Sequence, residues 1–188
     1  ISAVEMLCTL ADGGTIDLAG KRVCVIGGGN VAMDVTRSAI RLGANPVMTV
    51  YRRRQVDMTA LVEEVRSAVA EGAEIMELHA PVRIETDPEH RVTALIAQPK
   101  LIGKYGRDGR PAPSDCALPE VRIPCDVVIV AIGQGIETHY FEEKGIPIKR
   151  GVIAAENWSA VENAPGVFAG GDCVTGPATA IRAIAAGK

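Results

Sequence analysis

Aromatic residues are scarce in this chain of 188 residues. It contains one Trp, three Tyr and two Phe, which together make up only 3% of the sequence. Proteins that bind single-stranded nucleic acids stack bases on aromatic side chains, and this chain has few such side chains. Its net charge of −3, from 20 basic and 23 acidic residues, is also unfavourable for a polyanionic partner. We therefore expect no nucleic-acid partner and no membrane partner.

Cysteine pairs, clustered histidines and long apolar runs are also missing. The five cysteines include no C-x-x-C pair, and the three histidines lie far apart in the sequence. Scattered cysteines in odd number are typical of reduced thiols in a cytosolic protein, so we predict a cytoplasmic location and no metal site in this segment. No apolar run is long enough to span a membrane, and no signal peptide is visible. Because the chain begins at Ile1 and ends at Lys188 inside an expected helix, we interpret it as a fragment.

The most informative stretch runs from residue 22 to residue 43. The apolar run 23–26 has the length and composition of a buried parallel strand, and apolar residues from Val31 to Leu42 recur with helical spacing. Between them the turn reads Gly27-x-Gly29-x-x-Ala32, which is the dinucleotide-binding fingerprint in its strand–turn–helix context. Gly27 permits the tight turn, and Gly29 lets backbone amides approach a pyrophosphate at the helix N-terminus. The alternative is an ordinary glycine-rich turn before a surface helix.

Three arginines follow the next expected strand, residues 47–51. An NAD-binding unit has an acidic residue about 20 positions beyond the glycines, where it accepts hydrogen bonds from the ribose 2′-OH. This chain instead has Arg52, Arg53 and Arg54, and the sequence shows no carboxylate near that position. Guanidinium groups suit the dianionic 2′-phosphate of NADP. The pattern therefore favours NADP over NAD, the alternative being a solvated basic turn.

The remaining pattern predicts an α/β fold with a Rossmann-like parallel sheet and an antiparallel β insertion. Residues 59–72 read as an amphipathic helix with Leu61, Val62, Val65, Ala68 and Val69 facing inward. Shorter runs predict strands at 75–78, 82–85 and 92–97, followed by a polar loop from 103 to 114. We expect the insertion to replace the later crossover helix of the nucleotide domain.

The C-terminal third begins with the most strongly apolar run, residues 126–132, which ends at Gly133. Ligands of open α/β sheets bind where strands end in this way. Short strands are expected at 152–154 and 167–169. The second of these leads into Gly170-Gly171-Asp172, and a helix is then predicted from Pro177 to the end of the chain.

Four stretches resemble the FAD-dependent NAD(P)H oxidoreductases typified by the glutamate synthase small (beta) subunit. They are VIGGGNVAMD (25–34), VYRRR…DMTALVEEV (50–65), DVVIVAIGQ (126–134) and GVFAGGDCVTGPATAIRAIAAGK (166–188). They occur in order over nearly the whole chain, and the last two together are highly specific. The resemblance implies the NADPH domain of a two-dinucleotide-binding flavoprotein, residues 1–134. Residues 135–188 would then be a linker and the returning segment of an incomplete FAD domain.

The resemblance also implies roles for individual residues. The NADPH pyrophosphate would be held by Gly27, Gly29, Asn30 and Val31, and the 2′-phosphate by Arg52 and Arg53. The FAD-facing residues would be Gly171, Asp172, Pro177, Ala178 and Thr179, and Gly133, at the end of the run 126–132, is a further candidate cofactor-binding residue. No catalytic side chain is expected, because the cofactors carry the chemistry. In the family, hydride passes from NADPH to FAD, and electrons continue through 4Fe-4S clusters to glutamate synthase large subunit or another redox partner.

Two departures from the family pattern bear on these expectations. Thr59 stands where the family often has proline, which leaves it as a possible helix N-cap. The family's own FAD fingerprint and iron–sulfur cysteines, which lie near its N-terminus, are absent from this stretch. We therefore expect the fragment alone to be inactive, and its unpartnered apolar C-terminal helix to favour disorder or self-association into a homo-oligomer.

Three alternatives remain open from the sequence. The first is the flavin subunit of another redox enzyme, such as dihydropyrimidine dehydrogenase, ferredoxin–NADP transhydrogenase or sulfide dehydrogenase. The second is a nucleotide-sensing domain without a redox role, in which Asp172 and the helix after it would be unneeded. The third is a disulfide reductase of similar architecture, which the missing C-x-x-C pair disfavours within this segment.

Overall fold

The computed structural model describes residues 1–106, 109–156 and 160–187, and the chain divides into two compact units. Unit 1 comprises Ile1–Ile132 and unit 2 comprises Gly133–Lys188. Each unit is described by itself below. The sequence predicts the boundary between a nucleotide domain and a returning segment two residues later, at residue 134.

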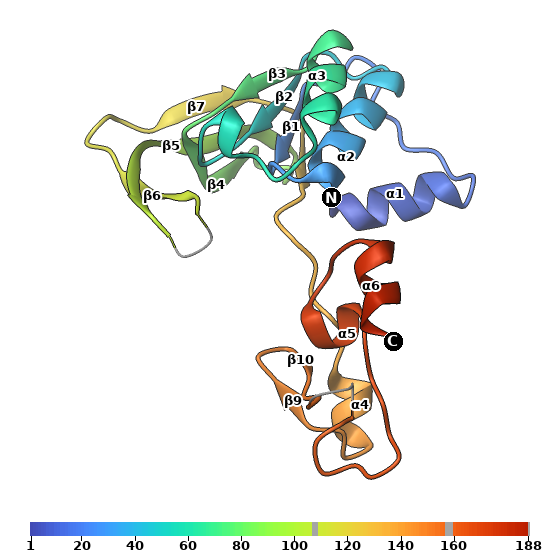
Figure 1. The fold of residues 1–188 in the computed structure, drawn as a ribbon. Coiled ribbons are helices and arrows are strands. Elements are labelled where there is room, and N and C mark those ends of the chain that lie inside the picture. The colour runs from blue at the N-terminus through green and yellow to red at the C-terminus, as the bar shows by residue number, and fades with distance from the viewer. Residues whose placement is uncertain (107–108, 157–159, 188) are drawn as a thin grey trace. The chain divides into compact units, whose positions relative to one another are not determined.

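A parallel sheet of four strands forms the centre of unit 1 (Figure 1). Its strands lie in the order β3-β2-β1-β8, with β1 (Val23–Ile26) between β2 (Val47–Val50) and β8 (Val127–Val130), and β3 (Glu74–Met76) at one edge. Ile26 lies level with Val50 and Val130, so the carboxyl ends of the three strands open at the same edge. This sheet confirms the predicted Rossmann-like class.

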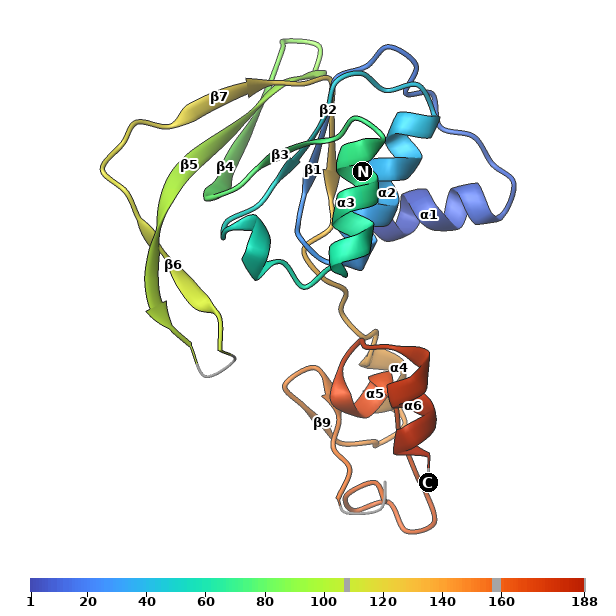
Figure 2. The same cartoon turned by 45° about the horizontal axis from the view of Figure 1, so that its top comes forward.

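Three helices cover one face of this sheet. They are α1 (Ala3–Ala11), α2 (Asn30–Arg41) and α3 (Val62–Ala70), and they lie together on one side in both views (Figures 1 and 2). Val23 and Val25 of β1 point into the core under these helices, while Cys24 and Ile26 belong to a second core on the other face. This alternation follows from the two-residue period of a strand, and both faces are apolar because both are covered.

An antiparallel sheet covers the other face. It contains β4 (His79–Thr86), β5 (Val92–Tyr105) and β7 (Val121–Pro124), with β6 (Pro111–Asp115) extending it as a hairpin from β5. Its apolar side packs on the parallel sheet through Leu95, Ala97 and Ile123, next to the buried thiols of Cys24 and Cys125. The predicted β insertion is therefore a third layer of unit 1.

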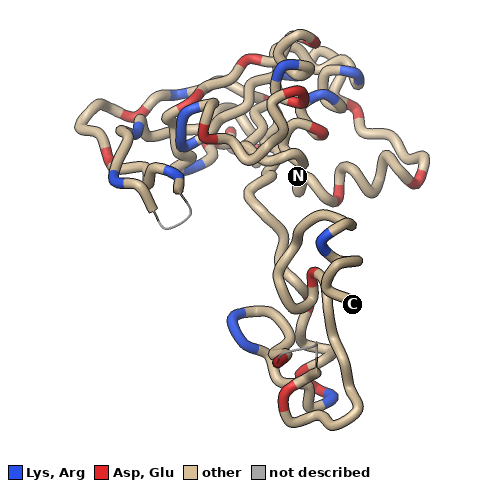
Figure 3. Tube along the Cα trace, in the orientation of Figure 1, with Lys and Arg blue, Asp and Glu red and all other residues tan. Residues whose placement is uncertain are grey.

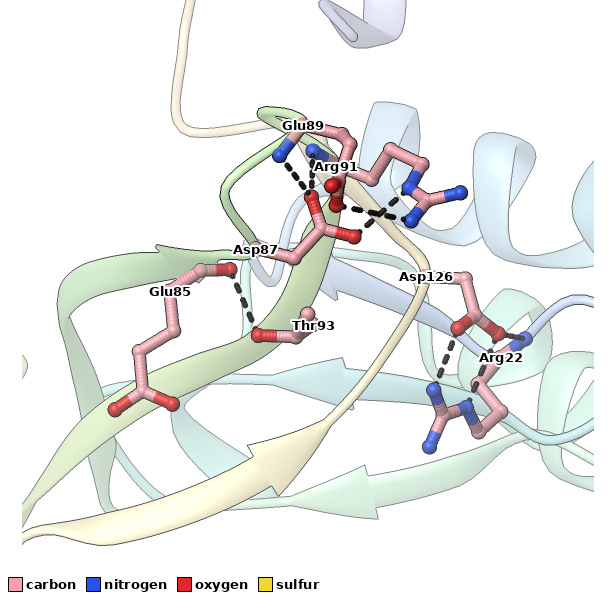
Figure 4. Close-up of polar contacts among 7 residues, drawn as sticks. All are labelled: Arg22, Glu85, Asp87, Glu89, Arg91, Thr93 and Asp126. Carbon is pink, nitrogen blue, oxygen red and sulfur yellow. Dashed lines mark hydrogen bonds and ion pairs between the residues drawn. The ribbon is translucent and has the colours of Figure 1, made fainter.

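Two polar clusters hold the ends of these layers (Figure 4). Arg22 precedes β1 and binds the carboxylate of Asp126, which precedes β8, through Nε (3.0 Å) and Nη2 (2.5 Å). These bonds, together with that from the Arg22 amide, lower the pKa of Asp126 to about 2. In the β4–β5 turn, Asp87 accepts from the Arg91 amide (2.9 Å) and the Arg91 guanidinium (2.8 Å). The first cluster joins the amino-terminal ends of β1 and β8, and the second fixes the turn between β4 and β5.

Two expectations about unit 1 are wrong in detail. The third helix begins at Val62 and not at Thr59, because the amides of Thr59 and Ala60 donate to the Gly28 carbonyl instead. Leu61, Val62 and Val69 are exposed rather than inward-facing, although Val65 and Ala68 are buried as predicted.

The expected loop 103–114 belongs to a hairpin. Strand β5 continues to Tyr105, which lies opposite Pro111 of β6. Gly103 allows close approach of the two strands, since a Cβ there would lie 2.4 Å from the Ala112 carbonyl oxygen. Residues 107 and 108, within the predicted loop, lie outside the described part of the chain.

The described residues of unit 2 form short elements. They are α4 (His139–Glu143), β9 (Ile148–Lys149), β10 (Val152–Ile153), α5 (Asp172–Thr175) and α6 (Ala180–Ala186). The expected strand at 167–169 is wrong: Phe168 forms an isolated bridge to Ala160 and no strand includes it. The last helix begins at Ala180 rather than Pro177, after the unpredicted α5, and its expected end at Lys188 lies outside the described residues.

Candidate nucleotide-binding site

The glycine turn between β1 and α2 is the centre of the candidate site. Gly27 has φ +147°, and a Cβ there would lie 2.3 Å from the Ala131 carbonyl oxygen. A Cβ at Gly28 would lie 2.5 Å from the ring of Tyr51. The fold itself therefore requires glycine at both positions.

Gly29 differs from its two neighbours. Its φ of −100° is open to any residue, and the nearest atom to an added Cβ would be Thr59 Oγ1 at 3.4 Å. The fold thus gives no reason for glycine at this position. A dinucleotide pyrophosphate that approaches the backbone at the third position of the turn would give one.

Three successive backbone amides at the end of this turn are free to bind an anion, although the Gly27 amide donates to the Val50 carbonyl. Gly29, Asn30 and Val31 are the cap and first two residues of α2, and their amides donate to no acceptor among the described residues. The next two amides, of Ala32 and Met33, both donate to the Gly29 carbonyl. Three successive free N–H groups at the positive end of a 12-residue helix suit a pyrophosphate. The residues present therefore fit the nucleotide that the fingerprint predicts.

A second segment, residues 57–61, is bound directly to the turn. The Gly28 carbonyl accepts from Thr59 (3.0 Å) and Ala60 (3.1 Å), and Asn30 Oδ1 accepts from the Leu61 amide (2.8 Å). The Tyr51 hydroxyl donates to the Asp57 carbonyl at 2.9 Å. These bonds explain why the glycine turn has one defined shape. The sequence did not predict the role of Tyr51 or the structural role of Asn30, whose partner Leu61 lies 31 positions along the chain.

The three arginines after β2 have different surroundings. Arg52 is exposed, and its side chain has no polar partner among the described residues. Arg53 donates through Nε to the Pro111 carbonyl of β6 at 2.8 Å. Arg54 binds both carboxylate oxygens of Asp57, at 2.7 and 2.9 Å. The expectation that no carboxylate lies near these arginines is therefore wrong for Arg54.

The electrostatics follow from these contacts. The paired guanidinium of Arg54 lowers the pKa of Asp57, and the carboxylate of Asp57, with the hydroxyl of Tyr105, raises the pKa of Arg54. Arg54 is thus a structural cation, and a phosphate would meet Arg52 and the terminal nitrogens of Arg53. Basic and acidic positions are otherwise mixed along the chain, as Figure 3 shows.

The predicted flavin-facing residues lie in unit 2 and form a local cluster. Asp172 Oδ1 accepts from the Ala178 amide at 3.2 Å, which closes the segment that contains Pro177 and leads to Thr179, the cap of α6. Gly171 has φ +70°, and an added Cβ would lie 3.2 Å from the Ala183 side chain. Asp172 is exposed, and its second oxygen has no partner among the described residues. The cluster fits one wall of a cofactor site. Gly133, with φ +125°, has open space around it.

The described residues contain no group of three His, Cys, Asp or Glu side chains that could hold a metal ion. Nor is any helix within those residues long and apolar enough to cross a membrane.

Comparison with solved structures identifies the fold. Mycobacterium tuberculosis FprA in complex with NADPH matches with a TM-score of 0.75 and 20% identity, over 96% of this chain and 54% of that one. The thioredoxin reductase of T. acidophilum matches with a TM-score of 0.70 and 20% identity, over 96% of this chain and 52% of that one. The chain thus has the fold of two-dinucleotide-binding flavoprotein reductases.

Sequence relatives are more similar but much longer. The NADP(+)-dependent formate dehydrogenase subunit beta of Moorella thermoacetica is 39% identical over 91% of this chain and 24% of its own length. The glutamate synthase [NADPH] small chain of Azospirillum brasilense is 34% identical over 94% of this chain and 37% of its own length. The model of the pyridine nucleotide-disulphide oxidoreductases matches residues 4–187. The chain belongs to this family and is related to the glutamate synthase small subunit.

Proposed function

We propose that the chain is the NADPH-binding part of a flavin-dependent oxidoreductase, with one segment of its FAD site. The observation that carries the proposal is the trio of free amides beside Gly29, a glycine that the fold does not need. The cofactors supply the chemistry of such an enzyme, a hydride passing between NADPH and FAD and electrons leaving singly through 4Fe-4S clusters. The role of this chain is to bind and orient the cofactors.

Each proposed role has a local basis. Gly27, Gly29, Asn30 and Val31 hold the pyrophosphate at the start of α2, where Asn30 also fixes the turn through Leu61. The 2′-phosphate is bound by Arg52 and Arg53. The residues proposed to face FAD are Gly171, Asp172, Pro177, Ala178 and Thr179, and Gly133 is proposed as a further cofactor-binding residue at the end of β8. The exposed oxygen of Asp172 is the polar group that this segment presents.

The electron acceptor is proposed as a partner subunit in the cytoplasm. A glutamate synthase small chain and a formate dehydrogenase subunit beta are both among the relatives, at 34% and 39% identity. Glutamate synthase large subunit is one candidate partner. The identity to the formate dehydrogenase subunit favours a second, the redox subunit of another enzyme.

Calorimetry with NADP⁺ and NAD⁺ tests the nucleotide assignment. We expect NADP⁺ to bind more tightly, and Arg52→Ala to remove about 1–3 kcal/mol of that preference, the range of charge-assisted hydrogen bonds. Arg66→Ala, a charge removed from the outer side of α3, is the matched control and should leave the preference unchanged. Equal affinities for the two nucleotides in the unaltered chain would contradict the assignment.

A further inference from the structure

The β5–β6 hairpin makes little contribution to the core of unit 1. Beyond Pro99, the strand partner of β5 is β6, from Lys100 opposite Asp115 to Tyr105 opposite Pro111, and the Lys100 amide also donates to the Leu78 carbonyl at 2.7 Å. Its large apolar side chains are exposed, Leu101 by 53% and Tyr105 by 67%. Burial of apolar surface is what holds most hairpins to a domain, and this hairpin buries little. Core packing therefore does not explain why this hairpin is present.

One end of the hairpin contacts the arginine segment. Pro111, the first residue of β6, is buried, and its carbonyl accepts the Nε hydrogen of Arg53 at 2.8 Å. Tyr105, opposite Pro111, also interacts with Arg54.

The segment that carries Arg53 is fixed from its other side as well. The amide of Leu78 donates to the Arg53 carbonyl at 3.0 Å, and the amide of His79 donates to the Tyr51 carbonyl at 3.0 Å. The backbone of Arg53 is thus held by the start of β4, and its side chain by β6. A guanidinium that uses Nε in this way keeps both terminal nitrogens for a second acceptor.

We propose that the β5–β6 hairpin is a selectivity element for 2′-phosphorylated nucleotides, in which the Pro111 carbonyl holds Arg53 so that its terminal nitrogens meet the 2′-phosphate. Arg53 is the binding residue, and the hairpin is its positioning element. The inference rests on the proposed function. Holding the side chain in advance lowers the entropy lost on binding, which amounts to about 2- to 10-fold in affinity for one long side chain.

The first experiment shortens the hairpin. Residues 101–114 are replaced by Asn-Gly, a two-residue turn that joins Lys100 to Asp115. NADP⁺, NAD⁺, 2′,5′-ADP and 5′-AMP are titrated by calorimetry. We expect NADP⁺ and 2′,5′-ADP to bind about 2- to 10-fold more weakly, and NAD⁺ and 5′-AMP to bind as before. Leu118→Ala, 61% exposed in the same insertion, is the matched control and should change none of the four affinities.

The second experiment is a double-mutant cycle between the hairpin and Arg53. If the hairpin acts through Arg53, then Arg53→Ala should weaken 2′,5′-ADP binding less in the shortened chain than in the full hairpin. Tyr105→Ala, at an exposed position opposite Pro111, gives a milder variant should the shortened chain fail to fold. It should reduce the ratio of NADP⁺ to NAD⁺ affinity in the same direction.

Two results would overturn the inference. One is an equal loss of affinity for NADP⁺ and NAD⁺, which a merely structural hairpin would cause. The other is an additive cycle, in which Arg53→Ala costs the same with and without the hairpin. Failure of the unaltered chain to bind either NADP⁺ or 2′,5′-ADP would instead contradict the proposed function, so the two failures are distinguishable.

Discussion

At the scale of single residues, Gly27 and Gly29 are glycines for different physical reasons. A Cβ at Gly27 would clash with the Ala131 carbonyl oxygen, whereas Gly29 has an ordinary backbone conformation and a Cβ there would make only van der Waals contact with Thr59 Oγ1. Gly29→Val should therefore abolish dinucleotide binding with little change in the thermal midpoint. Gly27→Ala should lower the free energy of unfolding by more than about 1 kcal/mol, because the new Cβ meets a carbonyl oxygen in a left-handed conformation. Calorimetry and urea unfolding separate the two effects, and normal binding by Gly29→Val would place the nucleotide elsewhere.

The Arg22–Asp126 pair predicts a dependence of stability on pH. Hydrogen bonds from Arg22 lower the pKa of Asp126 to about 2 in the folded protein, below its unfolded value near 3.9. As pH falls, Asp126 is protonated in the unfolded state at a higher pH than in the folded state. The stabilisation from this ion pair is therefore present above about pH 4 and is lost as pH falls to about 2. We expect the thermal midpoint of Asp126→Asn to fall less than that of the unaltered chain between pH 6 and pH 3. Parallel curves for the two proteins would contradict this assignment.

At the scale of elements, one buried hydrogen bond joins α2 to the sheet. Thr36 of α2 and Thr49 of β2 are fully buried, and their hydroxyl oxygens lie 3.0 Å apart. Thr36 also donates to the Ala32 carbonyl, so Thr49 is the donor between the two hydroxyls. Thr49→Val keeps the shape and removes this bond, which should cost about 0.5–1.5 kcal/mol in urea unfolding. Thr9→Val, at an exposed hydroxyl of α1, is the control, and an equal cost for both would show that the buried bond adds nothing.

Local patterns account for the elements that the sequence predicted. Strands β1 and β2 are short runs that are buried almost throughout, helix α2 has a spacing of apolar residues that matches its burial, and the glycine turn lies between β1 and α2. The hairpin was missed because its Gly- and Pro-rich sequence is also typical of a loop, and its pairing depends on residues far along the chain. Separation along the chain also explains why the bond of Arg53 to Pro111, 58 positions away, was not predicted. It does not explain the Arg54–Asp57 pair, whose members are only three positions apart.

At the scale of the whole molecule, unit 2 exposes several large apolar side chains. Phe168 is 70% exposed, and Ile181 and Ile184 of α6 are 78% and 70% exposed. The described residues contain one fingerprint turn, which we assign to NADPH. We therefore expect the chain, expressed as these 188 residues, to purify without flavin and without NADPH oxidation activity. A flavin absorbance band that survives gel filtration near one FAD per chain would contradict this.

The distribution of thiols in the two units has a practical consequence. Cys24 and Cys125 are buried between the two sheets of unit 1, and the hydrogen bond between them, with burial, raises the pKa of Cys24. Cys8 is exposed, and Cys116 and Cys173 are half-buried. An alkylating reagent should thus modify three cysteines promptly and the remaining two only when the sheets separate. The delay before the last two adducts appear in intact-mass spectra therefore measures the rate at which the interface between the two sheets opens. The measurement requires no introduced label.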